Sequence, residues 1–138
     1  MMGTGQPAPD WEALRSAAVT VAARAYAPYS GLQVGAAALV DDGRVVTGCN
    51  VENVSYGLGV CAEVTMAGQL RLSGGGRLLA VACRSGTGAL LMPCGRCRQV
   101  LYEFGGPELL CDTRRGVLPF TEVLPDGFGP ADLPAGRK

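Results

Sequence analysis

Apolar residues recur at intervals of three and four residues near the start of the chain. They are Trp11, Leu14, Ala18, Val21, Ala22 and Ala25. This spacing places them on one face of a helix, and Asp10 just before them is a favourable N-cap. The pattern predicts a helix from Trp11 to about Tyr26, because Pro28 prevents its continuation.

A different pattern follows this helix. The residues from Gln33 to Val40 are small and mostly apolar, and β-prone residues return from Arg44 to Cys49. The segment between them, Asp41-Asp42-Gly43, is typical of a tight turn. We therefore expect an antiparallel hairpin.

Helices and strands are expected to alternate over the rest of the chain. We expect a loop over residues 50–60, helices over about 61–72 and 94–104, and strands over 78–83, 90–91 and 108–111. Strands that alternate with helices after an initial hairpin predict an α/β fold, a three-layer α/β/α sandwich around a mixed sheet.

The length of the chain fits one domain. Its 138 residues are enough for one hydrophobic core and too few for two catalytic domains. We expect residues 1–138 to form that domain, with a loose lead-in over residues 1–9. Residues 117–138, where Pro and Gly are frequent, are expected to form an irregular tail with at most one short turn of helix.

The residue types that the chain lacks exclude several kinds of chemistry. It has no histidine, which excludes Ser-His-Asp triads, Cys-His proteases and HExxH zinc hydrolases. Its single lysine is the last residue, Lys138, which argues against a P-loop lysine and a pyridoxal Schiff base. The chemistry must come from cysteines, carboxylates, arginines, tyrosines or a bound metal.

The charge pattern restricts the partners. The 12 basic and 12 acidic residues cancel, and the arginines are scattered along the chain. A polynucleotide binder normally presents a basic face, so we expect no nucleic-acid partner. The apolar runs are shorter than a membrane span and no leader is apparent, so we expect no membrane partner and a cytoplasmic location. So few charges give little protection against self-association, which fits an oligomer.

The six cysteines are the residues that point most clearly to a metal or redox site. Cys94 and Cys97 are three residues apart at a predicted helix start, an arrangement shared by zinc half-sites and redox disulfides. Cys61, at another predicted helix start, is the candidate third thiolate. Three thiolates would leave one position of a tetrahedral zinc open, as in catalytic sites. The other three cysteines are expected to be small buried hydrophobes, although one of them could close the site as a structural fourth ligand: Cys49, Cys83 and Cys111.

Glu63 stands two residues after Cys61. Residues two apart on a helix point away from each other, so both can approach one metal only if Cys61 lies at or before the N-cap. A carboxylate beside a metal-held water, without binding the metal, can move protons. The alternative is an ordinary first-turn glutamate favoured by the helix dipole.

These blocks resemble a known family. Cys61-Ala62-Glu63 followed by Pro93-Cys94-Gly95-Arg96-Cys97 is similar to the zinc deaminase signature in its three-cysteine form. Further blocks resemble the small homotetrameric cytidine deaminases, and the resemblance covers about Trp11 to Cys111. These blocks are Pro28-Tyr29-Ser30, Val34-Gly35-Ala36-Ala37, Asn50-Val51-Glu52-Asn53 and Arg98-Gln99-Val100-Leu101.

The resemblance implies a role for each matching residue. Cys61, Cys94 and Cys97 would hold Zn²⁺, which would activate a water as hydroxide for attack on C4 of the pyrimidine. Glu63 would take a proton from that water, pass it to ring N3 and later protonate the departing amine, acting as base and then as acid. The substrate-binding residues would be Asn50 and Glu52 at the sugar hydroxyls, Ala62 at the base through its backbone, Leu32 against the pyrimidine, and Tyr56 and Phe128, which would complete the site of a neighbouring subunit.

Two departures from the family pattern bear on this site. Many members have an arginine directly after the glutamate, where this chain has Val64. Three thiolates and Zn²⁺ sum to −1, so we expect Arg96 or Arg98 to donate hydrogen bonds to sulfur in its place. Leu32 stands where the family commonly has phenylalanine, and it can pack against a ring without aromatic stacking.

The resemblance implies hydrolytic deamination of cytidine and 2′-deoxycytidine to the uridines, in pyrimidine salvage. A relative that acts on a modified cytosine nucleoside such as blasticidin S remains an alternative within the same chemistry. Editing of RNA or DNA would need a basic channel, which this neutral chain does not offer. The alternative outside enzymes is a structural zinc module closed by a fourth cysteine.

Overall fold

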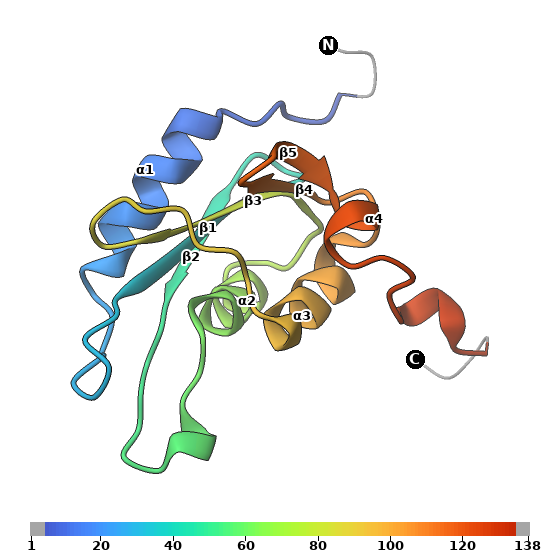
Figure 1. Ribbon diagram of the computed structural model, residues 1–138. Coiled ribbons are helices and arrows are strands. Elements are labelled where there is room, and N and C mark those ends of the chain that lie inside the picture. Colours follow the sequence, from blue (N-terminus) through green and yellow to red (C-terminus); the bar gives the residue numbers. More distant parts are fainter. Residues whose placement is uncertain (1–4, 135–138) are drawn as a thin grey trace.

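A five-stranded sheet lies at the centre of the molecule (Figure 1). The computed structural model describes residues 5–134. The strands are β1 (Val34–Val40), β2 (Val45–Cys49), β3 (Leu78–Ser85), β4 (Leu110–Thr113) and β5 (Gly116–Pro119), in the order β2-β1-β3-β4-β5. The β3–β4 pair is parallel and the other pairs are antiparallel, so the predicted mixed sheet is confirmed.

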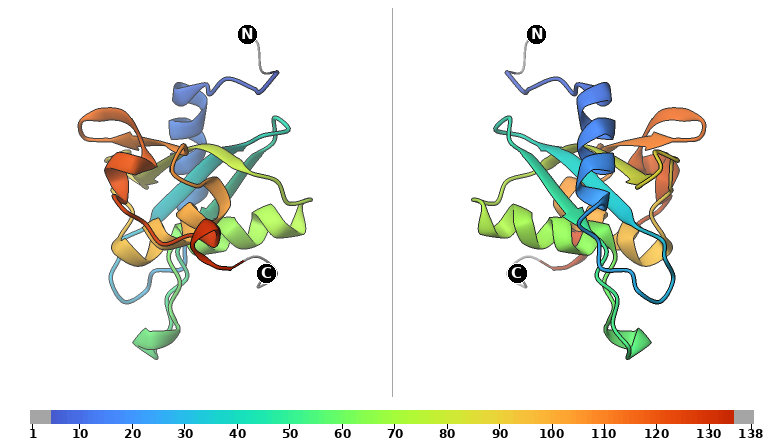
Figure 2. Two further views of the ribbon diagram at one scale, coloured as in Figure 1. Left: turned by 90° about the vertical axis from the view of Figure 1, so that its right-hand side faces the viewer. Right: turned by 90° about the vertical axis from the view of Figure 1, so that its left-hand side faces the viewer.

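Helices cover both faces of this sheet (Figures 1 and 2). Helix α1 (Trp11–Ala22) packs on one face, and α2 (Ala62–Leu72) and α3 (Gly95–Gly105) pack side by side on the other. A short α4 (Phe120–Val123) follows β5, and 3₁₀ turns span Tyr56–Leu58 and Pro130–Asp132. The three-layer α/β/α sandwich predicted from the sequence is therefore confirmed.

Alternation along β3 divides the core between the two faces. Ala80 and Ala82 belong to the cluster under α1, whereas Val81 and Cys83 belong to the larger cluster under α2 and α3. Successive side chains of a strand point to opposite faces, so a continuously apolar strand serves both layers. This is why β3 shows no polar alternation in the sequence.

A glycine brings the start of α2 directly onto the sheet. A Cβ atom added at Gly48 of β2 would lie 2.4 Å from both the Ala62 carbonyl oxygen and the Met66 amide nitrogen. Such distances are far inside van der Waals contact, so only glycine permits this approach. The first turn of α2 is thereby held at a fixed height above β2.

The first helix ends earlier than the sequence pattern suggested. It ends at Ala22, and Tyr26 forms a bridge with Val51 in which the Tyr26 N–H donates to the Asn50 carbonyl at 3.0 Å. The Glu52 N–H donates in turn to the Tyr26 carbonyl at 2.8 Å. The expected boundary near Tyr26 was wrong because this long-range pairing competes with the last helical turn.

The tail is more regular than predicted. Strand β5 begins at Gly116 and extends into the segment expected to be irregular, α4 is a short helical turn of the kind expected there, and Phe120 is fully buried. The Phe120 N–H donates to the Leu109 carbonyl at 2.8 Å, which ties this segment to the sheet. The expectation was wrong because four-residue elements are too short to show periodicity. Leu90, expected in a strand, forms only one isolated bridge with Arg84.

The ends of the chain match the expectation only in part. Residues 5–9 form no helix or strand, as predicted for the lead-in, and residues 1–4 and 135–138 lie outside the described residues. Within residues 5–134, no helix is long and apolar enough to cross a membrane.

Candidate active site

Two helix starts bring three cysteine sulfurs together. Cys61 is the N-cap of α2, Cys94 is the N-cap of α3, and Cys97 lies in the first turn of α3. Their Sγ atoms all lie within 4.8 Å of one another, although Cys61 is more than thirty residues from the other two. The required geometry, with Cys61 at the cap and not inside the helix, is present.

The environment of these thiols suits a cation. The pKa of Cys94 is lowered because the Cys97 backbone N–H donates to its sulfur, an effect that outweighs its partial burial. Burial raises the pKa of Cys61, and the nearby Cys94 and Glu63 charges raise it further. Burial is also the main cause of the raised pKa of Cys97. Three crowded thiolates at a partly buried point need a compensating positive charge, and soft sulfur donors fit Zn²⁺.

The remaining cysteines do not join this group. Cys83 and Cys111 are buried and Cys49 is half-buried. Among residues 5–134, the only metal-binding cluster of His, Cys, Asp or Glu groups consists of Cys61, Cys94 and Cys97. A structural zinc site closed by a fourth thiol, the alternative considered from the sequence, therefore has no fourth cysteine in place.

Glu63 lies beside the three sulfurs, as the second residue of α2. Its side chain is buried, with 4% of the residue exposed. One carboxylate oxygen, Oε2, accepts a hydrogen bond from the Cys83 thiol at 3.3 Å. Glu63 also lines a cavity, so a buried carboxylate faces the space in which a ligand would lie.

This cavity has a volume of about 500 Å³, and Cys61 and Cys94 are part of its lining. It brings together most of the site residues that the sequence predicted. Those lining it are Leu32, Asn50, Glu52, Tyr56, Cys61, Ala62, Glu63, Cys94 and Arg96. Its size and mixed lining fit a small polar molecule with one flat apolar part.

Glu52 and Asn50 are the polar lining residues that follow β2. Glu52 accepts hydrogen bonds from the Tyr29 N–H at 3.0 Å, the Ser30 N–H at 3.2 Å and the Ser30 hydroxyl. The Ser30 hydroxyl is the main cause of the lowered pKa of Glu52, against the opposing effect of burial. Asn50 accepts from the Val34 N–H at 2.8 Å and donates to the Leu32 carbonyl at 2.9 Å. Both side chains are therefore held in place before any ligand binds.

Comparison with known proteins agrees with this geometry. The pattern of the family described as the cytidine and deoxycytidylate deaminase zinc-binding region matches residues 9–113. The chain belongs to this deaminase family. It is 61% identical over 132 residues to the cytidine deaminase of Mycobacterium tuberculosis, which covers 96% of this chain and 99% of that protein.

Solved structures of deaminases share the fold. A crystal structure of the M. tuberculosis cytidine deaminase superposes with a TM-score of 0.86 at 61% identity, covering 88% of this chain and 99% of that one. The cytidine deaminase of Mycobacterium leprae gives a TM-score of 0.83 at 55% identity, covering 86% of this chain and 99% of that one. Zinc is the metal of this family, and the cluster in the deaminase fold described above is compatible with it.

The two arginines near the cysteines of this deaminase differ in their contacts. Arg98 donates to the Pro93 carbonyl at 2.8 Å and to the Val123 carbonyl at 2.9 Å, so it joins α3 to α4. Neither of these acceptors is a sulfur. Arg96 is exposed and lines the cavity together with Cys61 and Cys94, whereas Arg98 does not line it.

Phe128 and Tyr56 lie apart from the metal cluster. Phe128 is 58% exposed and does not line the cavity of its own chain, and its carbonyl accepts from Gln99 at 2.7 Å. Tyr56 is 83% exposed, and its ring centroid lies 6.4 Å from that of Tyr29. Both rings are available to a neighbouring molecule.

Sequence analysis missed two contacts in this site. Ser30 lies in a block that resembles the family, but no feature of that block predicts its hydrogen bond to Glu52. Cys83 was treated as an inert small hydrophobe, but its thiol donates to Glu63. The only sequence feature that points to the Cys83 contact is the alternation of side-chain direction along β3. It places Cys83 on the face of the sheet that α2 covers.

Proposed function

We propose that the chain hydrolyses the exocyclic amine of cytidine and 2′-deoxycytidine, giving uridine or 2′-deoxyuridine and ammonia, in pyrimidine salvage. The observation that carries the proposal is the cluster of three sulfurs next to the buried Glu63 in a nucleoside-sized cavity. The similarity to the cytidine deaminase of M. tuberculosis supports the same reaction.

Glu63 moves the protons of this reaction. Bound zinc, held by Cys61, Cys94 and Cys97, would supply a Lewis acid that lowers the pKa of water toward neutrality. Glu63 accepts one proton from the attacking water and passes it to ring N3 as oxygen adds at C4. It then takes the second proton from the oxygen at C4 and gives it to the amine, so the C4–N bond breaks and ammonia leaves. One carboxylate serves as base and then as acid because its burial excludes competing solvent.

The sugar end of the substrate is recognised by Glu52 and Asn50. The Glu52 carboxylate has a lowered pKa, so it is ionised at neutral pH and accepts hydrogen bonds from ribose hydroxyls. The spare amide hydrogen of Asn50 donates to the same sugar. Free cytosine would leave these groups without ligand partners, which favours the nucleoside over the base.

The base lies between Leu32 and the start of α2. Leu32 lines the cavity and packs against the pyrimidine face, and the Ala62 backbone contacts the base edge. Arg96, which lines the cavity, offsets the charge of the thiolates, whereas Arg98 stabilises the helix that carries two of them.

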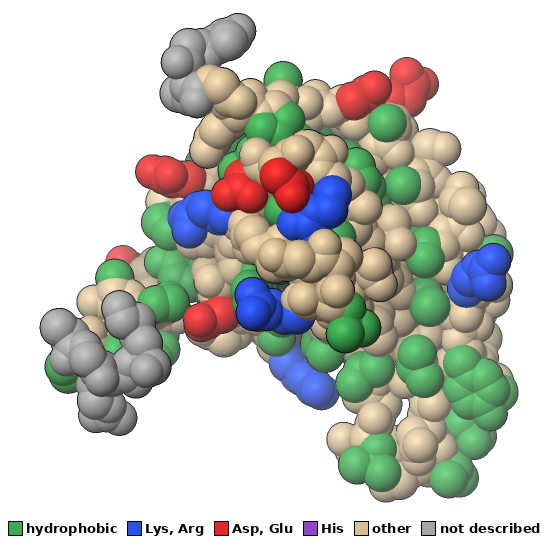
Figure 3. Space-filling model, turned by 180° about the vertical axis from the view of Figure 1, so that it is seen from behind, with side chains coloured by type: hydrophobic (Ala, Val, Ile, Leu, Met, Phe, Trp, Pro, Cys, Tyr) green, Lys and Arg blue, Asp and Glu red, His purple; other side chains and the backbone are tan. Residues whose placement is uncertain are grey.

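The active form is a homotetramer whose subunits complete one another's sites. Exposed hydrophobic side chains gather on the lobe formed by residues 26–32 and 50–60, which Figure 3 shows at its lower right and Figure 2 shows projecting from the body. Among them are Tyr26, Tyr29, Leu32, Val51, Val54, Tyr56 and Leu58. So large an exposed apolar surface is typical of an interface. Tyr56 would reach a neighbouring subunit's site from this lobe, and the exposed Phe128 would do so from the C-terminal segment.

We also propose a setting for the enzyme. Residues 1–138 act as one deaminase domain in the cytoplasm, on a free nucleoside and without a nucleic-acid partner. The neutral net charge supports this choice over an edited polynucleotide.

Replacing Glu63 by glutamine tests the proposal. Cytidine turnover, followed by the absorbance change from cytosine to uracil, is expected to fall roughly 10²–10⁴-fold in Glu63→Gln, the range for a proton-transferring group. Zinc content and melting temperature should be nearly unchanged, and Glu103→Gln, an exposed carboxylate on α3, should keep full activity.

Three outcomes would overturn the proposal. They are unchanged turnover in Glu63→Gln, absence of cytidine turnover in the wild type, and preference for blasticidin S over cytidine. The last outcome would transfer the assignment to the modified-nucleoside alternative.

A further inference from the structure

Cys83 lies directly behind the carboxylate of Glu63. Its Sγ atom is 3.3 Å from Glu63 Oε2, and both residues are buried, with 3% and 4% of their surface exposed. The contact joins β3, at the centre of the sheet, to the first turn of α2. Cys83 is paired with Ala36 of β1, so its position is fixed by the backbone ladder of the sheet.

The two oxygens of Glu63 have different surroundings. Oε2 accepts from Cys83, whereas Oε1 receives no hydrogen bond from any residue within 5–134. Glu63 nevertheless lines the cavity. A side chain with one oxygen bound on the sheet side and the other without a protein partner presents that second oxygen to a ligand.

We propose that Cys83 is a positioning residue for the deamination reaction, which holds Glu63 by a thiol hydrogen bond to Oε2 so that Oε1 transfers the protons. The inference rests on the proposed function, since it concerns the residue that shuttles protons there. It adds a residue outside the cavity lining, which acts only through Glu63.

A thiol suits this position better than a cationic donor. An arginine or lysine would hold the carboxylate strongly and reduce its ability to accept a proton, whereas S–H is a weak neutral donor. Burial also keeps Cys83 protonated by raising its pKa, and the Glu63 charge adds to that effect. The contact thus orients the carboxylate while leaving its basicity largely intact.

Restricting Glu63 matters because proton transfer depends on geometry. A glutamate side chain has several rotatable bonds, and catalytic groups lose efficiency when they are misplaced by fractions of an ångström. Glu63 must serve both the attacking water and the leaving amine. A donor on a rigid central strand limits the rotation that would otherwise move Oε1 away from either.

Three variants test this role. Cys83→Ala removes the donor, Cys83→Ser keeps a donor of similar size, and Cys111→Ala removes a thiol equally buried in the same core cluster, whose Sγ hydrogen bond goes to the Asp112 carbonyl at 3.7 Å. With the zinc-loaded enzyme, Cys83→Ala should lower kcat for cytidine roughly tenfold, with KM within about twofold, because one hydrogen bond to a charged group is lost. Cys83→Ser should restore kcat to within about threefold of the wild type.

If Cys83 had only a structural role, the kcat values of these variants would rank differently. A buried serine hydroxyl in an apolar core would then be as harmful as alanine or worse, and Cys111→Ala would lower kcat as much as Cys83→Ala. Either result overturns the inference, as does wild-type kcat in Cys83→Ala. Should Cys83→Ala fail to fold, Cys83→Val removes the donor while filling the space, and the same kcat loss is expected.

A spectroscopic measurement tests the contact without turnover. The S–H stretching band of Cys83, isolated as the infrared difference between the wild type and Cys83→Ala, should move to higher frequency in Glu63→Ala, which removes the acceptor. An unmoved band overturns the inference.

The inference and the proposed function fail in different ways. An inactive Glu63→Gln combined with a fully active Cys83→Ala removes only the role of Cys83. An active Glu63→Gln, or a wild type that does not turn over cytidine, removes both.

Discussion

Ser30 illustrates how much of this site depends on single side chains beyond the metal cluster. It supplies two of the three hydrogen bonds that Glu52 accepts, one from its N–H and one from its hydroxyl. The hydroxyl also accepts from the Leu32 N–H at 3.0 Å, so it links Glu52 and Leu32, the residues proposed to contact the sugar and the base. We therefore expect Ser30 to influence substrate binding more than the chemical step.

The Ser30→Ala variant checks this. Its KM for cytidine is expected to rise about three- to tenfold, with kcat within about twofold, because Glu52 loses one hydrogen bond on the sugar side and Glu63 is untouched. Ser55→Ala, in the same projecting lobe, should leave both constants unchanged. An equal loss of kcat would show that Ser30 supports the reacting groups instead.

For single residues, the sequence predicted the three clustered cysteines and Glu63. It did not predict the side chains that hold Glu52 and Glu63 in place. Cys61, Cys94, Cys97 and Glu63 were found because spacing and residue type are local signals. The contacts of Ser30 with Glu52 and of Cys83 with Glu63 join residues 22 and 20 positions apart. Such pairs arise from strand placement and loop closure, which no local pattern displays.

The packing of α2 on β2 links an element to the chemistry. Helix α2 carries Cys61 at its cap and Glu63 in its first turn, and Gly48 allows that turn to lie on the sheet. Any side chain at position 48 must therefore move the start of α2.

Gly48→Ala should damage stability and activity together. Overpacking is expected to lower the free energy of unfolding by about 1–3 kcal/mol, and kcat should fall because Glu63 moves relative to the cysteines of α3. Gly68→Ala is the matched control, since a Cβ there would meet nothing within 4 Å and the residue is exposed in the middle of α2. The free energy of unfolding of Gly68→Ala should rise by about 0.5–1 kcal/mol. Wild-type kcat in Gly48→Ala would argue against this coupling.

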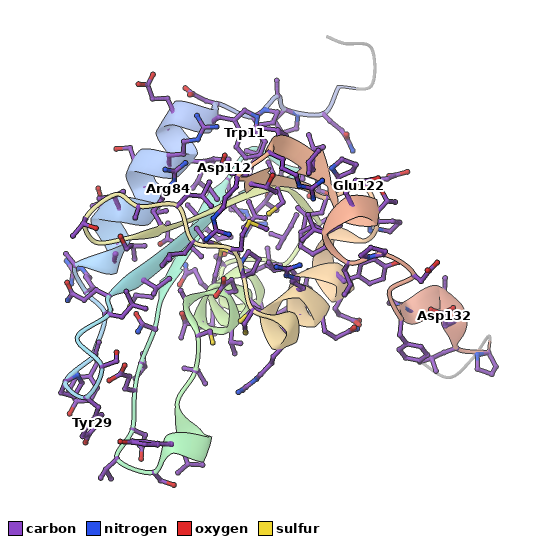
Figure 4. The ribbon with its side chains drawn as sticks, in the orientation of Figure 1. Trp11, Tyr29, Arg84, Asp112, Glu122 and Asp132 are labelled. Carbon is purple, nitrogen blue, oxygen red and sulfur yellow. The ribbon has the colours of Figure 1, made fainter. Side chains whose placement is uncertain are left out.

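Asp112 joins three elements through two arginines. Arg84 of β3 lies 2.7 Å from one oxygen of Asp112 on β4, and Arg15 of α1 lies 3.1 Å from the other. Figure 4 shows Arg84 and Asp112 close to each other near α1. Burial alone would raise the pKa of Asp112, but hydrogen bonds from the two arginines outweigh burial and lower it.

Asp112→Asn should therefore reduce stability in a pH-dependent way. The pKa of Asp112 in the folded protein lies below its ordinary value of 3.8. The stabilisation by its ion pairs is therefore complete above pH 3.8 and is lost as the pH falls through the pKa of the folded protein. At pH 7 the free energy of unfolding of the variant should be about 2–4 kcal/mol lower than that of the wild type. This difference should shrink below pH 3.8. Urea titrations at several pH values measure this, with the exposed Asp126→Asn as control. A difference that is constant with pH would contradict it.

Element boundaries were predicted well where local chemistry sets them. The N-terminal limits of α2 and α3 follow from loop glycines and prolines, and the hairpin of β1 and β2 follows from its turn. The end of α1 and the short β5 and α4 depend on pairing with distant segments, namely Val51 for Tyr26 and Leu109 for Phe120. Local periodicity therefore could not place them.

For the whole molecule, the metal is expected to act as a link between α2 and α3. The three sulfurs come from two helices that the sheet already holds together, so the fold has a core independent of the metal. Removing zinc with a chelator should abolish turnover and lower the melting temperature by roughly 10 °C, without unfolding at 25 °C. Circular dichroism and readdition of zinc check this. Complete unfolding on chelation would show that the metal is required for the fold.

The overall architecture was predictable because the alternation of helices and strands leaves few arrangements that bury both faces of the sheet. The assembly was less predictable. Exposed apolar residues are scattered in the sequence over residues 26–32 and 50–60, and they form one surface only after the Tyr26–Val51 bridge brings these segments together.

Different kinds of structure form the inner end and the outer rim of the cavity. The inner end consists of helix starts seated on the sheet, while Glu52 and Tyr56 at the rim belong to a connecting loop outside the core. Loops tolerate sequence change far better than packed helix starts. Descendants of this enzyme, natural or engineered, can therefore exchange one sugar or modified nucleoside for another by altering the rim alone, and inherit the hydrolytic machinery unaltered.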